Sequence, residues 1–201
     1  MSEETVYQLV ALQFNISSGT SKRGQPSPAT KTCAKFLIRE YIKRIKSDIL
    51  PAPAFVALHD RVSRQDCNNI RTAFRERPGC NTELTILPSG ESKEVRLLYD
   101  QNTVTSLTDT EYILAQDDFF RRHDGGDVRD QWNTKSRQLF ERIDGGLFQH
   151  NKSSQYIVAI SYHGINNSTP DAGKREHIEG IYTILRSVTN VRTSLHAGEE
   201  V

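Results

Sequence analysis

Three polar residues stand where apolar runs of the sequence come to an end. Asn15 closes the first run, Asp60 follows a second run, and His163 follows a third. Taken singly, each is more often a turn residue or a strand terminator. If three strands end at one edge of a sheet, however, an amide, a carboxylate and an imidazole can converge on one cleft, where they suit magnesium and phosphate. The recurrence therefore favours a shared site.

The elements that would position these residues are strands. Residues 6–15, 54–58 and 156–162 are short, apolar segments rich in β-branched and aromatic residues, which is typical of buried strands. The segment YIVAISY at 156–162 is the clearest of them.

Helices are expected between and after these strands. Residues 31–49 carry apolar side chains at helical spacing, and Ser63–Asp66 has the form of a capping box that starts a helix over 63–76. Thr169-Pro170 supplies a cap and a first-turn proline for a helix over 170–188, which has Ile178, Ile181, Tyr182 and Leu185 on one face. Strand, helix and strand at the start predict a βαβ unit.

The middle of the chain indicates a meander of short strands at 83–87, 95–99 and 103–107. A further strand is expected at 137–143, and the charged segment 115–135 is expected to be a loop. The two Asp-Gly-Gly sequences, at Asp124 and at Asp144, are interpreted as turns. We expect one domain over residues 1–190, followed by a frayed tail over 191–201.

Composition limits the class of protein. The chain has 201 residues, 36% hydrophobic and 25% charged, and its net charge of +1 indicates neither a nucleic-acid nor a membrane partner. Cys33, Cys67 and Cys80 form neither a disulfide framework nor a zinc motif. No signal peptide or membrane span is evident, so an intracellular protein, cytoplasmic or nuclear and not secreted, is expected.

Two other sites were weighed. Residues 19–24 have the GxxxxG spacing of a phosphate-binding loop, but Gln25-Pro26 stands where Lys-Ser/Thr is needed. The acidic segment around Asp124 and Asp127 lacks the ligand spacing of a calcium loop, so a surface turn is favoured.

The quoted segments resemble the endonuclease/exonuclease/phosphatase (DNase I-like) superfamily of magnesium-dependent phosphodiesterases. Residues 12–16, LQFNI, are similar to the family's first strand, and residues 53–60, PAFVALHD, to its "PDIIALQE" strand. Residues 94–104 and 156–164 are similar to two later family strands, the second ending in a histidine.

The resemblance implies roles for the three residues. It places Asp60 at the position of a magnesium ligand, Asn15 at the asparagine of the first strand, and His163 facing the phosphate. The implied substrate is a phosphate-bearing molecule, either nucleic acid or a phospholipid or inositol phosphate, and the implied cofactor is Mg²⁺.

The family motifs "GDFN" and "SDH", which hold the phosphate and activate water, do not occur in the sequence. The expected fold is thus α/β, half of a four-layered αββα sandwich, with a mixed, mostly antiparallel sheet and helices on one face. A weakly active or inactive hydrolase domain is expected, and a non-catalytic binding module is the alternative. An uncovered sheet face predicts a homo- or heterodimer.

Overall fold

The structure is a computed structural model that describes residues 9–15, 36, 39–45, 52–75, 82–87, 93–109, 141–164 and 171–197. Residues 39–45 are helical, and the other elements follow in chain order. They are β1 (Ala11–Asn15), β2 (Phe55–Val62), α2 (Arg64–Arg75), β3 (Leu84–Ile86), β4 (Lys93–Asp100), β5 (Val104–Asp109), β6 (Ile143–His150), β7 (Tyr156–Tyr162) and α5 (Asp171–Ala197).

The strands form two sheets. A four-stranded sheet has the order β1-β2-β4-β3, and a three-stranded sheet has the order β5-β6-β7. β1 and β2 are parallel, with helical residues 39–45 between them in the chain, so the expected βαβ start is confirmed. All other strand pairs are antiparallel. The predicted α/β class with mixed, mostly antiparallel pairing is therefore also confirmed.

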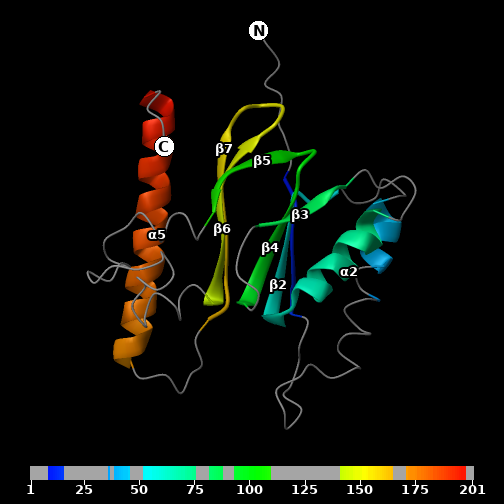
Figure 1. The fold of residues 1–201 in the computed structure, drawn as a ribbon, viewed down its shortest axis with the longest axis horizontal. Helices are drawn as coiled ribbons and strands as arrows, with labels where there is room; N and C mark the ends of the chain where they lie inside the picture. Colours follow the sequence, from blue (N-terminus) through cyan, green and yellow to red (C-terminus); the bar gives the residue numbers. More distant parts are fainter. Residues whose placement is uncertain are drawn as a thin grey trace.

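Three hydrophobic clusters divide the molecule into four layers (Figure 1). The first cluster joins the helical residues 39–45 and α2 to the four-stranded sheet, through side chains such as Ile42, Phe74 and Leu58. The second lies between the two sheets and includes Phe55 and Phe148. The third joins the three-stranded sheet to α5. The layers thus run helix, sheet, sheet, helix.

This layering differs from the expectation of a single sheet with an uncovered face. Phe55 and Tyr99 on the four-stranded sheet pack against Phe148 on the other sheet, at ring-centroid distances of 5.0 and 5.3 Å. The chain therefore supplies its own second sheet. The sequence pattern missed it because β6 was not recognised as a strand.

The segment that contains β6 is where the sequence predictions for the middle of the chain were wrong. The strand expected over 137–143 begins only at Ile143, and Asp144-Gly-Gly, interpreted as a turn, lies inside β6. Gly145 has φ of 148°, and a Cβ atom there would lie 2.1 Å from the Ala159 carbonyl oxygen of β7. Gly146 leaves only 1.9 Å to the Thr108 carbonyl oxygen of β5. The glycines thus allow close approach of both neighbouring strands.

The expected meander is also wrong. β3 and β4 pair as expected, but β5 leaves the four-stranded sheet and pairs with β6. One polar contact joins the sheets at this point, because the backbone N–H of Leu97 in β4 donates to Oδ2 of Asp144 at 2.8 Å. The short strand β3 pairs only with residues 98–100 of β4, so the Asp144 carboxylate takes the N–H just beyond its reach.

The helix expected over 63–76 is α2, and its predicted capping box is confirmed. The Asp66 N–H donates to Ser63 Oγ, and the Ser63 N–H donates to Asp66 Oδ2, both at 3.1 Å. The inner side of the helix carries Cys67, Ile70 and Phe74, all buried. The cap and the apolar spacing together explain the start and the orientation of α2.

α5 is longer than expected and packs with a different face. It continues to Ala197, so residues 191–197 are helical rather than part of a frayed tail. No proline or glycine interrupts the sequence before Gly198, which explains the late end. Ile181 packs inward together with Ile184 and Val188, whereas the other three side chains expected on that face are exposed. These are Ile178, Tyr182 and Leu185.

Among the described helices, none is long and apolar enough to span a membrane. The segment 115–135, the loop over 19–24, Cys33 and Cys80 lie outside the described residues.

Candidate functional site

Strand directions bring several polar residues to one end of the two sheets. β1 and β2 run parallel, and their register pairs Asn15 with His59, the residue before Asp60. β4 runs the opposite way, so its first residues, including Glu94, lie at the same end. β6 and β7 are antiparallel, with Ile143 opposite Tyr162, which places Arg142 beside His163. The chain thus gathers residues from five strands and their ends.

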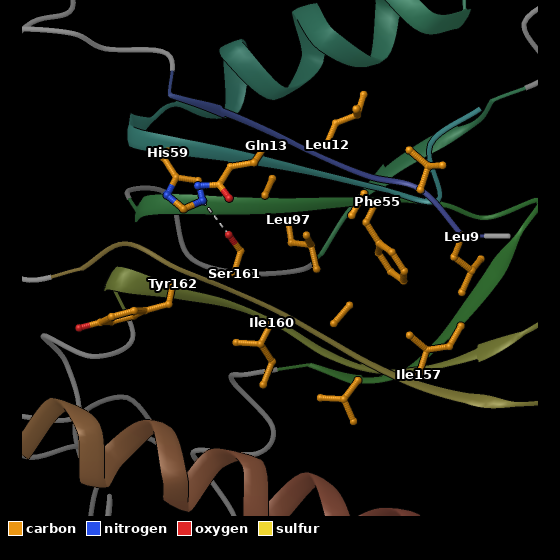
Figure 2. A pocket seen from close by; sticks show the side chains of 15 residues that line it. Leu9, Leu12, Gln13, Phe55, His59, Leu97, Ile157, Ile160, Ser161 and Tyr162 are labelled. Atoms are coloured by element: carbon orange, nitrogen blue, oxygen red, sulfur yellow. Dashed lines mark hydrogen bonds between the residues drawn. The ribbon is translucent and has the colours of Figure 1, made fainter. Parts of the chain in front are cut away.

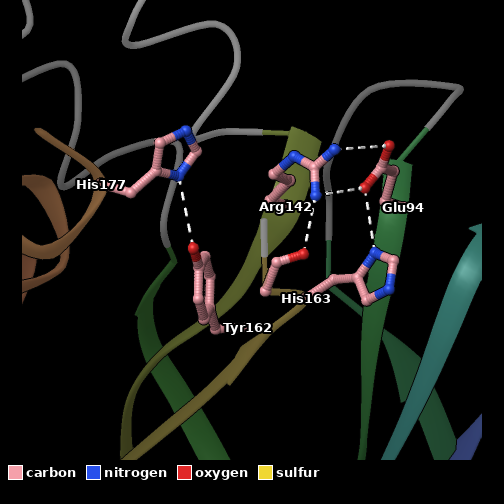
Figure 3. Close-up of polar contacts among 6 residues, drawn as sticks. Glu94, Arg142, Tyr162, His163 and His177 are labelled. Atoms are coloured by element: carbon pink, nitrogen blue, oxygen red, sulfur yellow. Dashed lines mark hydrogen bonds and ion pairs between the residues drawn. The ribbon is translucent and has the colours of Figure 1, made fainter. Parts of the chain in front are cut away.

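His163 is anchored by backbone and side chain. Its N–H donates to the Arg142 carbonyl oxygen at 2.8 Å, just after β7 ends. Its Nδ1 lies 2.9 Å from Oε2 of Glu94, as Figure 3 shows. Because a carboxylate can only accept, Nδ1 carries the hydrogen in this contact and Nε2 is left as the acceptor of the neutral ring.

Arg142 holds the same carboxylate with both of its terminal nitrogens. Nη1 lies 3.1 Å from Oε2 of Glu94, and Nη2 donates to Oε1 at 3.2 Å. Nη1 also donates to the Gly164 carbonyl oxygen at 2.8 Å. This two-point geometry fixes the Glu94 carboxylate more firmly than a single contact would, and Glu94 in turn orients His163.

His59 lies behind this group. Its ring stands 5.8 Å from that of His163, and its Nε2 lies 2.8 Å from Oγ of Ser161 in β7. His59 is only 5% exposed. Burial, and secondarily the positive charge that His163 can carry, lowers the pKa of His59 below its usual value of 6.5. His59 is therefore uncharged at neutral pH.

A cavity of about 440 Å³ opens next to His59, between β1 and β2 on one side and β7 on the other (Figure 2). His59, Gln13 and Ser161 form its polar end, while Leu9 and Ile157 lie toward the apolar end. Its size and its apolar lining with few polar groups are typical of a binding site.

The predicted residues can now be placed. His163 lies in the polar group with Glu94 and Arg142. Asn15 is the last residue of β1, as expected, whereas Asp60 lies within β2, which continues to Val62 instead of ending near Leu58. The side chains of Asn15 and Asp60 lie outside the described part of the structure.

Glu94, Arg142 and Ser161 were missed in the sequence. Glu94 is separated from Arg142 by 48 residues and from His163 by 69 residues, so no local spacing links them. The available signal was weak: a charged residue at the start of a strand, opposite a strand that ends in a histidine. That signal becomes specific only when the strand order is known.

The metal prediction can be compared with the donors present. Among the described residues, no group of three or more His, Cys, Asp or Glu side chains is arranged to hold a metal ion. Both oxygens of Glu94 are occupied by Arg142 and His163. A magnesium site would therefore depend on Asp60.

No family model, curated protein or solved structure matches this chain.

Proposed function

We propose that the polar group at the strand ends is the phosphoester site of a hydrolase domain, with weak activity. The observation that carries the proposal is the contact of His163 with Glu94, whose carboxylate is itself held by Arg142. A histidine oriented by a carboxylate is a common general base. His163 is also about one-third exposed, at 30%, so solvent can reach it.

In the proposed reaction, Nε2 of His163 takes a proton from the attacking water. The water oxygen forms a bond to phosphorus while the bond from phosphorus to the leaving alcohol breaks. Glu94 stabilises the imidazolium that results, as in other carboxylate–histidine pairs. Magnesium, if held by Asp60 near Asn15, supplies neutralisation of the phosphate charge.

Weak activity is expected for two reasons. The sequence lacks the "GDFN" and "SDH" motifs of the superfamily that it resembles. Arg142 is already engaged by Glu94, so it is a less effective partner for a phosphate oxygen. The same two facts support the alternative, a module that binds a phosphoester without cleaving it.

The test is cleavage of bis(p-nitrophenyl) phosphate and of duplex DNA by the purified chain with and without Mg²⁺. We expect slow, magnesium-dependent cleavage that is lost in Asp60→Ala and reduced about tenfold or more in His163→Gln and Glu94→Gln. Asp171→Ala and His177→Gln are matched controls on α5 and should retain the rate.

The outcomes separate the two functions. Cleavage that survives His163→Gln and Asp60→Ala would come from a contaminant and would contradict the hydrolase. No cleavage, combined with NMR shifts at His163 on addition of the phosphodiester, would support the binding module. No cleavage and no shifts would rule out both.

A further inference from the structure

We propose that the outer edges of β1 and β7 bind extended segments of another polypeptide, which adds one strand to each sheet. β1 ends the four-stranded sheet and β7 ends the three-stranded sheet. Among the strands that the structure describes, none pairs with either outer edge. The backbone N–H and C=O groups along such an edge are a template for a further strand.

The first argument is a contrast with the other two edges of the same sheets. β3, the opposite edge of the first sheet, is only three residues long, and β5, the opposite edge of the second, has a register shift between Ser106 and Thr108. Short strands and bulges are standard protection against unwanted pairing. This chain therefore protects two of its four sheet edges.

β1 and β7 carry no such protection. Their sequences, ALQFN and YIVAISY, contain no charged residue and no proline, and neither pairing has a register shift. β7 is also the strand richest in residues that favour sheets. Edges of this kind are found where pairing is intended.

The second argument is the cavity between the two edges. It is lined by the consecutive residues 9–13 and 157–162. Side chains alternate along a strand, so consecutive residues line a cavity only when the backbone edge itself faces it. Phe55, Leu97 and Ile157 belong to both the cavity wall and the core between the sheets, so this core is open along one side.

The cavity also identifies the occupant. A strand placed on each edge satisfies the backbone groups and directs alternate apolar side chains into the space of about 440 Å³. A second copy joined edge to edge would bring an equal cavity and leave the space unfilled. A small apolar molecule would fill the space without pairing the edges. Uncharged segments with apolar residues at alternate positions satisfy both requirements.

This inference does not depend on phosphoester chemistry, so it can fail or succeed separately from the proposed hydrolase. The probe is a synthetic peptide of alternating valine and threonine, about ten residues long, with a lysine at each end for solubility. A peptide of the same sequence, N-methylated at alternate residues, cannot pair along one edge and is the matched control.

The measurement is amide hydrogen exchange of the full chain by NMR. With the peptide we expect exchange to slow about tenfold or more at alternate residues of β1 and β7, and not with the methylated peptide. Val158→Lys, at an edge side chain that is 46% exposed, should weaken peptide binding about tenfold. Ile178→Lys, at a side chain of α5 that is 65% exposed, should not.

Three results would overturn the proposal. One is unchanged exchange in β1 and β7 at saturating peptide. Another is protection of these edges that appears without peptide and rises with protein concentration, since that would identify a second copy. The last is equal binding of both peptides, which would indicate an apolar site that does not use the strand edges.

Discussion

The ring of His59 stands edge-on to the ring of His163, with the centroids 5.8 Å apart and the planes at 87°. The two rings come from different sheets, and only His163 is partly open to solvent, its side chain being 30% exposed. A proton on His59 would therefore be buried, next to a second group that can carry positive charge. The pair links protonation to the stability of the contact between the sheets.

Stability should fall below the usual pKa of His59. The folded state holds that pKa below 6.5, so between the lowered value and 6.5 the unfolded chain binds more protons. The free energy of unfolding should be unaffected by His59 above this range and decrease as pH falls through it. Urea unfolding from about pH 5 to 8 should show a smaller decrease in His59→Gln than in the parent chain. An unchanged slope in that variant would contradict the prediction, and His177→Gln is the control.

Gly146→Ala should destabilise the fold strongly. The new Cβ would lie 1.9 Å from the Thr108 carbonyl oxygen, so β5 and β6 would have to separate. We expect a loss of about 3 kcal/mol or more, or no folding. Gly164→Ala is the matched control, because nothing lies within 4 Å of a Cβ there, and it should cost less than about 0.5 kcal/mol. Thermal and urea unfolding measure both, and equal losses would refute the contact.

Cys67 should be unreactive in the folded protein. Burial in the core raises the pKa of its thiol to about 12, so almost no thiolate is present at pH 8. In a chain with Cys33→Ser and Cys80→Ser, a thiol-specific reagent such as DTNB should label Cys67 only on unfolding. Gln65→Cys, on the exposed side of α2, should be labelled at once, and comparable rates at the two positions would disprove the burial.

Ser63→Ala should weaken the start of α2. The hydroxyl accepts the Asp66 N–H at 3.1 Å, and removing an N-cap of this kind costs about 1 kcal/mol. Ser63→Thr retains the oxygen and should restore most of the loss in urea unfolding. If threonine and alanine were equally destabilising, the hydroxyl contact would not be the cause.

Local patterns predicted the local structure well. β7 occupies 156–162 as expected, and the Ser63 cap begins α2, because strand composition and capping are properties of adjacent residues. β6 was missed because its Asp144-Gly-Gly sequence is also typical of a turn. Only the approach of β5 and β7 on either side explains why glycine is needed there.

The site was predictable only in part. The end of each strand was visible in the sequence, which is why Asn15 and His163 could be proposed. Glu94 and Arg142 become partners of His163 only through the order of the strands in two sheets. Likewise, the packing face of α5 is set by its position on the three-stranded sheet, since apolar residues occur on more than one side of the helix.

The connection between β6 and β7 is short, and this has a consequence for the order of folding. Residues 151–155 close the hairpin, whereas the parallel pairing of β1 with β2 must bring Ala11 beside Phe55. Short loops close faster and at a lower entropic cost than long ones. We therefore expect the hairpin to form early, although the ribosome releases β1 long before it. The first strand synthesised would then be among the last to reach its final place.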